Sequence, residues 1–429
     1  MRRPLILLFL AVLLLMCGAP PLIGSVAEDR HQFLLDQLTR ATTGAVPEVE
    51  QYETGWFTSR ARHRLSLTDE RAQRLAHLLA GARGSPPTSL VIDSVIAHGP
   101  WPLLEGAPGL ARMRSNLLVE GADGTRTAIP GQAVTRIGFG GGGRTRFLAG
   151  RAEGPMADGQ GVFTAAGADI LMVFDRHAAR LRSSGRLGPI EVAGTNGLMR
   201  SGDIDFESDT RPTPFGLRAG RSRVSLESFQ FIDRLGREVS GSGLEIDLTV
   251  EADGDTVDYA AEFDLATIEA AGGAPVSARL RLALEALDGV MLGALLQRVQ
   301  QGFPLREAGV ELADVVRPGS SLELSELALS AGDGRATLEL DLSLPDDHQR
   351  PLSDGSDLLS VVDGSGRLTL NRPMLNNALG LQGDENGDPI GLLSAGYLRR
   401  EDDSFVSDLR VSGGLITLNK LPLPLPFNR

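Results

Sequence analysis

Apolar and polar residues alternate one by one along much of the chain beyond residue 88. Between residues 244 and 250 every second side chain is Leu, Ile or Val, and the positions between them carry Glu, Asp or Thr. The same alternation resumes over residues 257–265, after an Asp253-Gly254 pair that is typical of a tight turn. Because side chains of a strand point alternately to opposite faces, this stretch is predicted to form a β-hairpin with one apolar and one acidic face.

Two further stretches repeat this design. Alternating leucines run over residues 322–344 on either side of a Gly-Asp-Gly turn, and a third hairpin is predicted around Gly413-Gly414. An antiparallel sheet with one apolar face must cover that face by curling, by packing helices on it, or by binding a ligand. We therefore expect a mainly β protein with some α: an extended, curved antiparallel sheet with a few packing helices and an N-terminal membrane-spanning or signal helix.

Helical spacing interrupts the strand pattern in a few places. Residues 68–81 are predicted to form a helix, since a threonine can cap its first turn and a glycine can end it. Apolar residues at helical spacing predict a longer helix over residues 282–303, and a shorter helix is expected after Pro373. Residues 28–48 mix leucines with charges and are predicted to form a short helix.

The N-terminus carries an export signal. Two arginines precede the uncharged apolar run 4–24, and about 20 apolar residues are enough to span a bilayer as a helix. Positive residues stay on the cytoplasmic side, so the chain from Glu28 onward is expected to be exported. Ser25 and Ala27 supply the small-x-small pattern of a cleavage site, so a retained anchor and a cleaved signal peptide are both open. We favour the retained anchor.

The segment WFTSRARHRL, which starts at Trp56, combines aromatic residues with arginines. Its alternation predicts a strand that buries one face and exposes the other. The face predicted to be buried carries Phe57, Ser59, Ala61, His63 and Leu65. The exposed face carries Arg60, Arg62 and Arg64. Such a row is most often solvated or paired with acidic strand faces, and contact with anionic lipid headgroups is the functional alternative near a membrane span. We favour the first interpretation, a row that is solvated or paired with acidic faces such as that of Glu245, Asp247 and Glu251.

Composition and motifs limit the chemistry. A formal charge of −13 argues against nucleic acid as a partner, because nucleic-acid-binding proteins are usually basic. The single cysteine, Cys17, excludes an intrachain disulfide and a four-cysteine metal site, and the six histidines form no pair at i,i+4 spacing. Residues 138–143 match a dinucleotide fingerprint but lack the helix that should follow. His98 is interpreted as a structural corner. No catalytic residue, metal ligand or cofactor is therefore assigned.

Three short blocks follow one another along the chain. The first contains Tyr52, Gly55, Trp56, Phe57 and Ser59; the second contains His98, Gly99 and Pro100; the third contains Gly413, Gly414 and Asn419. In this order the blocks resemble the YdgA-like bacterial envelope proteins, a family of uncharacterised function. Lys420 departs from the family pattern, in which we expect a glycine after Asn419. The resemblance implies a bacterial inner-membrane protein with a single N-terminal span and the bulk of the chain in the periplasm, or a periplasmic protein after signal cleavage.

The one-sided strands are also similar in architecture to the AsmA-like envelope proteins, whose long curved sheets form lipid-accommodating grooves. We divide the chain into the anchor or signal 1–27, a small α+β region 28–87, and an extended antiparallel β domain 88–429 with the helical insertion 282–303. The leading hypothesis is a non-enzymatic envelope protein, held to the membrane by its N-terminal helix, whose apolar sheet face binds lipid or a hydrophobic partner in envelope maintenance. The alternatives are a periplasmic scaffold or assembly factor that acts through protein contacts, for example as a homo-oligomer, and thirdly an envelope hydrolase.

Overall fold

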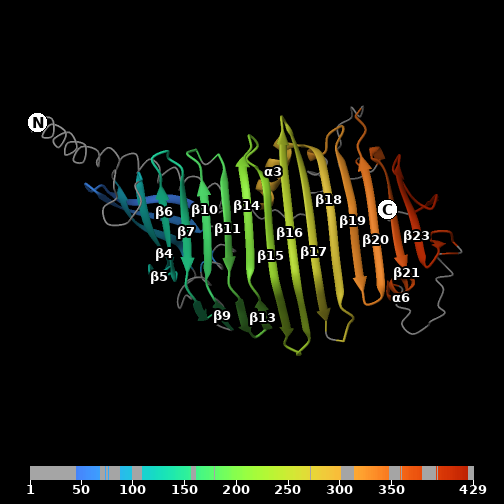
Figure 1. Ribbon diagram of the computed structural model, residues 1–429, viewed down its shortest axis with the longest axis horizontal. Coiled ribbons are helices and arrows are strands. Elements are labelled where there is room, and N and C mark those ends of the chain that lie inside the picture. The colour runs from blue at the N-terminus through green and yellow to red at the C-terminus, as the bar shows by residue number, and fades with distance from the viewer. Residues whose placement is uncertain are drawn as a thin grey trace, which may run out of the picture. The chain divides into compact units, whose positions relative to one another are not determined.

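The computed structural model describes the greater part of the chain beyond residue 44. The described residues are 45–67, 73, 76, 87–98, 109–155, 161–177, 179–270, 272–300, 314–346, 358, 360–378, 393 and 395–423. The chain divides into two compact units. The first unit contains Met1–Arg211 and Ile232–Gly236, and the second contains Pro212–Phe231 and Arg237–Arg429. Both units are built mainly of antiparallel strands (Figure 1).

Every element of the first unit whose bounds the structure defines is a strand. They are β1 (Ala45–Glu53), β2 (Thr58–Leu67), β3 (Pro87–His98), β4 (Ala111–Gly121), β5 (Arg126–Ala128), β6 (Gly131–Ile137), β7 (Gly143–Ala149), β8 (Ala152–Pro155), β9 (Gly161–Ala165), β10 (Ala168–Phe174), β11 (Leu181–Leu187), β12 (Ile190–Gly194), β13 (Gly197–Ser201) and β14 (Ile204–Pro212). Neighbouring strands pair antiparallel in the order β1-β2-β3-β4-β6-β7-β10-β11-β14. β5 pairs with β4, and β8, β9, β12 and β13 form a second antiparallel ribbon.

The second unit combines strands with two short helices. Its elements are β15 (Arg218–Asp233), β16 (Glu238–Asp253), β17 (Thr256–Ala270), β18 (Val276–Asp288), α3 (Gly289–Gln300), β19 (Ser321–Ala331), β20 (Gly334–Ser343), β21 (Asp363–Asn371), α6 (Arg372–Ala378), β22 (Arg399–Glu401), β23 (Ser404–Ser412), β24 (Leu415–Leu418) and β25 (Leu421–Pro422). From β16 onward the strands pair antiparallel in the order β16-β17-β18-β19-β20-β21-β23-β24-β25. β22 pairs with the start of β23. The prediction of a large antiparallel sheet with few helices is confirmed.

Strand β2 buries the face that its alternation predicts. Ser59, Ala61, His63 and Leu65 are buried, whereas the arginines between them are exposed or half-buried. Ala61 packs in a cluster with Ile96 of β3, Ala111 of β4 and Ile137 of β6, so the first unit has an apolar core on this face. The prediction for Phe57 is wrong: its side chain is 38 % exposed, because Trp56 and Phe57 lie in a bend before the strand begins.

The three predicted hairpins of the second unit are confirmed by the strand register. β16 and β17 meet at Asp253 and Thr256, β19 and β20 at Ala331 and Gly334, and β23 and β24 at Ser412 and Leu415. Gly413 and Gly414 both have positive φ, 55° and 78°, as a two-residue type I′ turn requires. The shorter helix expected after Pro373 is α6.

The long predicted helix 282–303 is partly wrong. Residues up to Asp288 belong to β18, where Leu282 and Leu284 lie opposite apolar residues of both β17 and β19. These leucines satisfy a period of two as well as a helical period, and pairing on both sides selects the strand. The helix begins at Gly289, and the Asp288 carboxylate accepts hydrogen bonds from the N–H groups of Val290 and Met291, both at 3.0 Å, as an N-cap does. Residues 301–303 lie outside the described residues.

Other helical predictions fall largely outside the described residues. Of the helix 68–81, Gln73 and Ala76 are described and both are helical. Of the segment 28–48, the described residues 45–48 belong to β1, so the predicted helix is wrong there, because this segment pairs with β2. The anchor or signal 1–27 lies outside the described residues. Among the described helices, none has the length and hydropathy needed to cross a bilayer.

His63 is a buried titratable group in the core of the first unit. Its side chain is 1 % exposed, and burial lowers the pKa of its imidazole below the ordinary value of 6.5. The folded chain therefore keeps His63 neutral at pH values where the unfolded chain binds a proton. This histidine favours folding above about pH 6.5, and that contribution is lost progressively as the pH falls.

We expect His63→Gln to remove this part of the pH dependence. The wild-type protein should lose stability as the pH falls from about 6.5, and the variant should lose less over the same range. Denaturant unfolding of the full chain at several pH values measures the effect, with His177→Gln at an exposed position as the control. Identical pH profiles of wild type and His63→Gln would contradict the burial-driven shift.

Candidate functional site

Two blocks of the sequence motif meet inside the first unit. Ser59 Oγ lies 3.0 Å from Nε2 of His98, and both residues are 1 % exposed. The backbone N–H of His98 donates to the Phe57 carbonyl at 2.9 Å, so β3 ends against the start of β2. A side chain at Gly55 would collide with the carbonyl oxygen of Thr58, so the bend before β2 requires a glycine.

The Ser59–His98 contact is buried in the core of the first unit. A serine beside a histidine is also the pair that nucleophilic hydrolases use, but such a serine must reach a substrate. Here burial closes both side chains to solvent, and the hydrogen bond satisfies polar atoms that would otherwise be costly to bury. The interpretation of His98 as a structural corner agrees with this geometry. The sequence gives no signal of the contact itself, because the partners are 39 positions apart. Gly99 and Pro100 lie outside the described residues.

The remaining residues of the first block have different environments. Tyr52 of β1 is half-buried against the cluster that contains Ala61, whereas Trp56 is 56 % exposed. The structure therefore brings Tyr52, Ser59 and His98 to the core side of the sheet and leaves the aromatic pair Trp56-Phe57 at its surface. No group of three or more metal-ligating side chains occurs among the residues that the structure describes.

The arginine row of β2 is largely engaged in ion pairs. Arg62 forms a two-point contact with Asp93 on β3, at 2.5 and 3.2 Å. Arg64 contacts Glu50 of β1 at 2.6 Å and Glu120 of β4 at 2.8 Å. The expectation of ion pairing holds for these two arginines, but the expected partners are wrong.

The carboxylates that pair with Arg62 and Arg64 come from nearby strands of the same unit: Glu50 and Asp93 lie on the neighbours β1 and β3, and Glu120 lies on β4, one strand beyond β3. Asp247, one of the expected partners, is held instead by Arg221 at 3.1 Å and Arg223 at 2.7 Å. Its hydrogen bond from Arg223, with a further one from Arg221, lowers the pKa of its carboxyl.

The second unit presents a broad apolar surface, which we call the leucine face. Directly opposite residues of an antiparallel pair point to the same side, so the register of β16 to β21 places their apolar residues together. Its central rows are Leu248, Ala261, Leu282, Leu324 and Leu340, and next to them Ile246, Phe263, Leu280, Leu327, Leu338 and Leu368. The outer rows are Val250, Tyr259, Leu284, Leu322 and Leu342 on one side, and Leu244, Leu265, Ala278, Leu329, Ala336 and Leu370 on the other.

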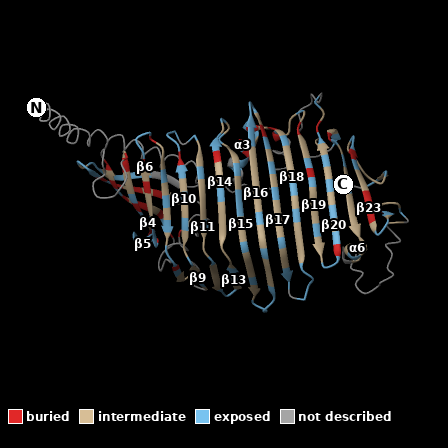
Figure 2. Ribbon diagram, in the orientation of Figure 1, coloured by how far each residue is buried: buried red, intermediate tan, exposed pale blue. Residues whose placement is uncertain are grey.

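The two described helices pack near the outer rows. Leu284 packs with Leu292 and Leu295 of α3, and Leu370 packs with Leu375 of α6. The central rows are half-buried, apart from Leu324 at 9 % exposure, and Figure 2 shows that tan, the colour of intermediate burial, prevails along the strands β16 to β20. In the core of the first unit, by contrast, Val91 and Ile96 are 0 % and 2 % exposed. The leucine face is therefore less covered than a finished core.

The reverse face of the same strands is charged, and ion pairs connect neighbouring strands on it. Arg279 contacts Asp264 at 2.5 Å, and Arg281 contacts Glu326 at 3.1 Å. Exposed ion pairs of this kind each add little stability, but charged side chains keep this side of the sheet in water. The sheet is thus amphipathic in cross-section, with water on its charged side and an apolar surface on the other.

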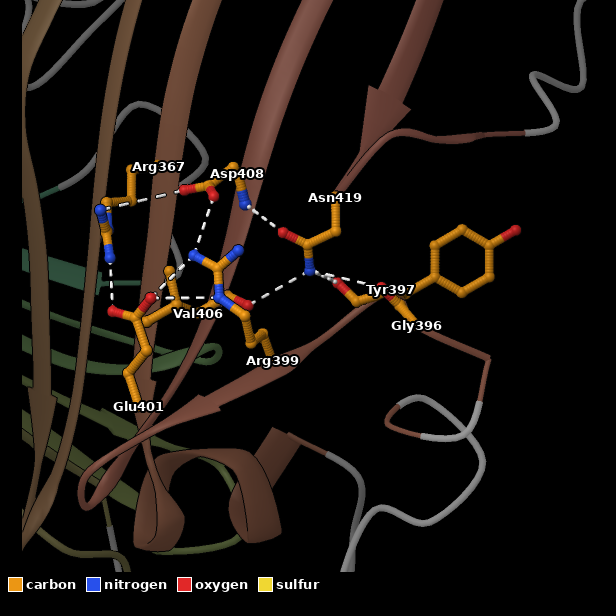
Figure 3. Close-up of polar contacts among 8 residues, drawn as sticks. All are labelled: Arg367, Gly396, Tyr397, Arg399, Glu401, Val406, Asp408 and Asn419. Atoms are coloured by element: carbon orange, nitrogen blue, oxygen red, sulfur yellow. Dashed lines mark hydrogen bonds and ion pairs between the residues drawn. The ribbon is translucent and has the colours of Figure 1, made fainter.

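Asn419 joins the last strands together (Figure 3). Its Nδ2 group donates to the carbonyls of Tyr397 at 3.0 Å, Gly396 at 3.3 Å and Val406 at 3.5 Å. Its Oδ1 atom accepts from the N–H of Asp408 at 2.9 Å, and its own N–H donates to the Asp408 carbonyl at 2.8 Å. One asparagine therefore ties the segment before β22 and the edge of β23 to the end of β24.

Ion pairs surround this junction and border a charged groove. Arg399 reaches Glu401 at 2.7 Å and Asp408 at 3.0 Å, and Arg367 reaches Glu401 at 2.5 Å (Figure 3). The groove has a volume of about 1130 Å³ and is also lined by Asn419. Among the charged residues that line it, Arg367, Arg399 and Asp408 belong to this ion-pair network.

Lys420 occupies the position at which glycine was expected. Asn419 and Lys420 have φ of 50° and 72°, and they form a two-residue turn between Leu418 and Leu421. Both turn positions are left-handed, which is the geometry that favours Asn-Gly. The turn forms with Lys420 in a backbone conformation that costs a non-glycine residue about 1–2 kcal/mol.

We expect Asn419→Ala to destabilise the second unit by about 2–3 kcal/mol, because several buried or half-buried backbone groups lose their partners. Asn419→Asp is the matched variant, since it keeps the acceptor for Asp408 but loses the Nδ2 donor, and it should fall between wild type and Asn419→Ala. Denaturant unfolding of the full chain measures both. An unchanged free energy of unfolding in Asn419→Ala would show that the junction carries no stability.

We expect Lys420→Gly to raise the free energy of unfolding by up to about 1 kcal/mol. Relief of the left-handed strain exceeds the extra backbone entropy that glycine loses on folding, about 0.5–1 kcal/mol. The same unfolding measurement tests this change. A loss of stability would mean that the turn is not strained by its lysine.

The chain was compared with known proteins. The family model described as bacterial protein of unknown function (DUF945) matches residues 1–426. No curated protein matches the chain, and no solved structure matches it. Because the family match covers nearly the whole length, it includes the Ser59–His98 contact, the leucine face and the Asn419 junction. The chain therefore belongs to the DUF945 family of bacterial proteins of unknown function.

Proposed function

We propose that the leucine face binds lipid acyl chains, and that the protein acts without catalysis in maintenance of the bacterial envelope. The observation that carries this proposal is the in-register array of apolar side chains on β16 to β21, whose central rows stay half-buried. Exposed apolar surface of this extent marks a binding site more often than an ordinary solvent-facing surface.

The free energy that a hydrocarbon ligand would gain by leaving water for such a surface is large. Each methylene group that moves from water to apolar surroundings contributes about 0.8 kcal/mol. The face is built almost entirely from Leu, Ile, Val and Ala, which offer no directional polar groups. It therefore suits a flexible hydrocarbon chain better than a ligand recognised by hydrogen bonds.

The envelope setting rests on the N-terminus and on the resemblance to YdgA-like proteins. The apolar run 4–24 and the arginines before it favour a single span with the rest of the chain in the periplasm. A protein held at the membrane surface would have lipid within reach of its apolar face. A scaffold that covers the face with another protein is the competing function, and the experiment below distinguishes the two.

The test is photo-crosslinking of the full-length protein in native membranes with a fatty acid that carries a photoreactive group near its tail. We expect crosslinks to peptides of β17 to β20. The double variant Leu282→Gln/Leu338→Gln places two polar amides in the central rows and should reduce crosslinking by about tenfold or more, since 1.4 kcal/mol is a factor of ten in affinity.

The control variant is Ala283→Gln/Thr337→Gln. It introduces the same residues on the same strands, but on the charged side of the sheet, and it should crosslink as the wild type does. Crosslinking that is absent from the wild type, or equal in both double variants, would refute acyl-chain binding. A single protein crosslinked to the face with no lipid would favour the scaffold.

A further inference from the structure

A second surface, on the first unit, concentrates positive charge. Arg112 of β4 lies directly opposite Arg136 of β6, and Arg136 lies directly opposite Arg144 of β7. Residues opposite each other across antiparallel strands point to the same face with their Cβ atoms about 4.5–5.5 Å apart. The three guanidinium groups therefore form one arginine row across three neighbouring strands, which lie side by side in Figure 1.

Such an arrangement is unfavourable without a counter-charge. Like charges directly opposite each other in a sheet are destabilising. Among the described residues, neither Arg136 nor Arg144 has an ion-pair or hydrogen-bond partner for its side chain. Arg112 has contacts of its own, and the argument rests on the other two members of the row.

Nearby arginines on the same face are neutralised differently. Arg146 holds Asp169 at 2.9 and 2.6 Å, and Arg186 holds Asp205 at 2.7 and 3.0 Å. The hydrogen bonds from these arginines lower the pKa of Asp169 and of Asp205, so both carboxylates stay ionised and engaged. They do not compensate the arginine row.

The row lines a groove of about 810 Å³. Five arginines and two aspartates line it, which leaves a formal excess of three positive charges (5 − 2). Val134, Leu171, Ser184 and Gly185 form the rest of its wall, and Leu171 is 37 % exposed. A hollow with unpaired guanidinium groups and an apolar margin fits an anion that carries several oxygens.

We infer that the arginine row of Arg112, Arg136 and Arg144 binds a phosphate group, carried by a phospholipid headgroup or by a small soluble phosphate ester. Guanidinium forks match the oxygen spacing of phosphate and form paired charge-assisted hydrogen bonds with it. A bound phosphate would also remove the repulsion within the row. This site is separate from the leucine face and does not depend on acyl-chain binding there.

The site also differs from the headgroup contact that was the alternative for Arg60, Arg62 and Arg64. Arg62 and Arg64 already hold carboxylates of their own, so they offer little to a further anion. Arg136 and Arg144 hold no such carboxylate among the described residues, so no carboxylate competes with an anion for their guanidinium groups. The alternation of arginines in VTRI and RTRFL was visible in the sequence, but the alignment of the two segments across strands was not.

The test uses the full-length protein in a neutral detergent and isothermal titration at low ionic strength. The probes are inorganic phosphate, glycerol phosphate, dihexanoylphosphatidylglycerol and dihexanoylphosphatidylcholine. We expect the wild type to bind the phosphate probes, and Arg136→Gln/Arg144→Gln to bind them at least about tenfold more weakly. Tighter binding of the phosphatidylglycerol probe than of glycerol phosphate assigns the site to a lipid headgroup, and equal binding assigns it to a soluble ester.

The control is Arg182→Gln/Arg200→Gln, which removes the same charge from arginines that each hold a carboxylate, Asp209 and Glu191. It should keep the wild-type affinity. The row variant should also unfold at a temperature no lower than the wild type, because it relieves like-charge repulsion. If it misfolds, Arg144→Gln alone, at an exposed position, serves in its place and should still weaken binding. No phosphate binding by the wild type, or equal loss in row and control variants, would overturn the inference.

Discussion

Strand register is the constraint on which both units depend. In a strand the side-chain period is two, so a slip of one residue would turn every leucine of the leucine face toward the charged side. Tight turns fix the register of the hairpins: Gly413 and Gly414 adopt positive φ at the turn between β23 and β24. Once one pair is in register, each following strand must match its apolar residues to those of its neighbour.

The same register determines which charged side chains of neighbouring strands lie close enough to form ion pairs. Where an arginine lies near a carboxylate on a neighbouring strand, an ion pair forms, as between Arg146 and Asp169. Arg180 and Arg182 together lower the pKa of Asp209 to about 2, chiefly through the hydrogen bond from Arg180. Individually such exposed pairs are weak, but together they keep one side of each sheet in water. Arg136 and Arg144 depart from this rule, because they have no such partner among the described residues, and this is the physical reason to propose a ligand for them.

The apolar faces of strands in the two units are buried to different extents. In the first unit, β2 and β3 bury most of their inner face, and polar groups such as Ser59 and His98 are accepted there because they satisfy each other. The second unit leaves the central rows of its leucine face half-buried. The sheet of the second unit is therefore apolar and half-buried on one side, and charged on the other.

The sequence by itself determined the class of structure: the period of two predicted the hairpins, the apolar faces and the buried side of β2, because alternation is a local property. The resemblance to the YdgA-like family, rather than the pattern of the sequence, pointed to Asn419 and to a glycine at the position of Lys420, where the backbone is left-handed. Only the tertiary structure decided that residues 282–288 belong to a strand. It also decided that Arg62 and Arg64 form ion pairs within their own unit, and that Arg136 and Arg144 lie directly opposite each other on neighbouring strands. Each of these depends on which strands are neighbours and in which register, and a single sequence does not encode that pairing in any local pattern.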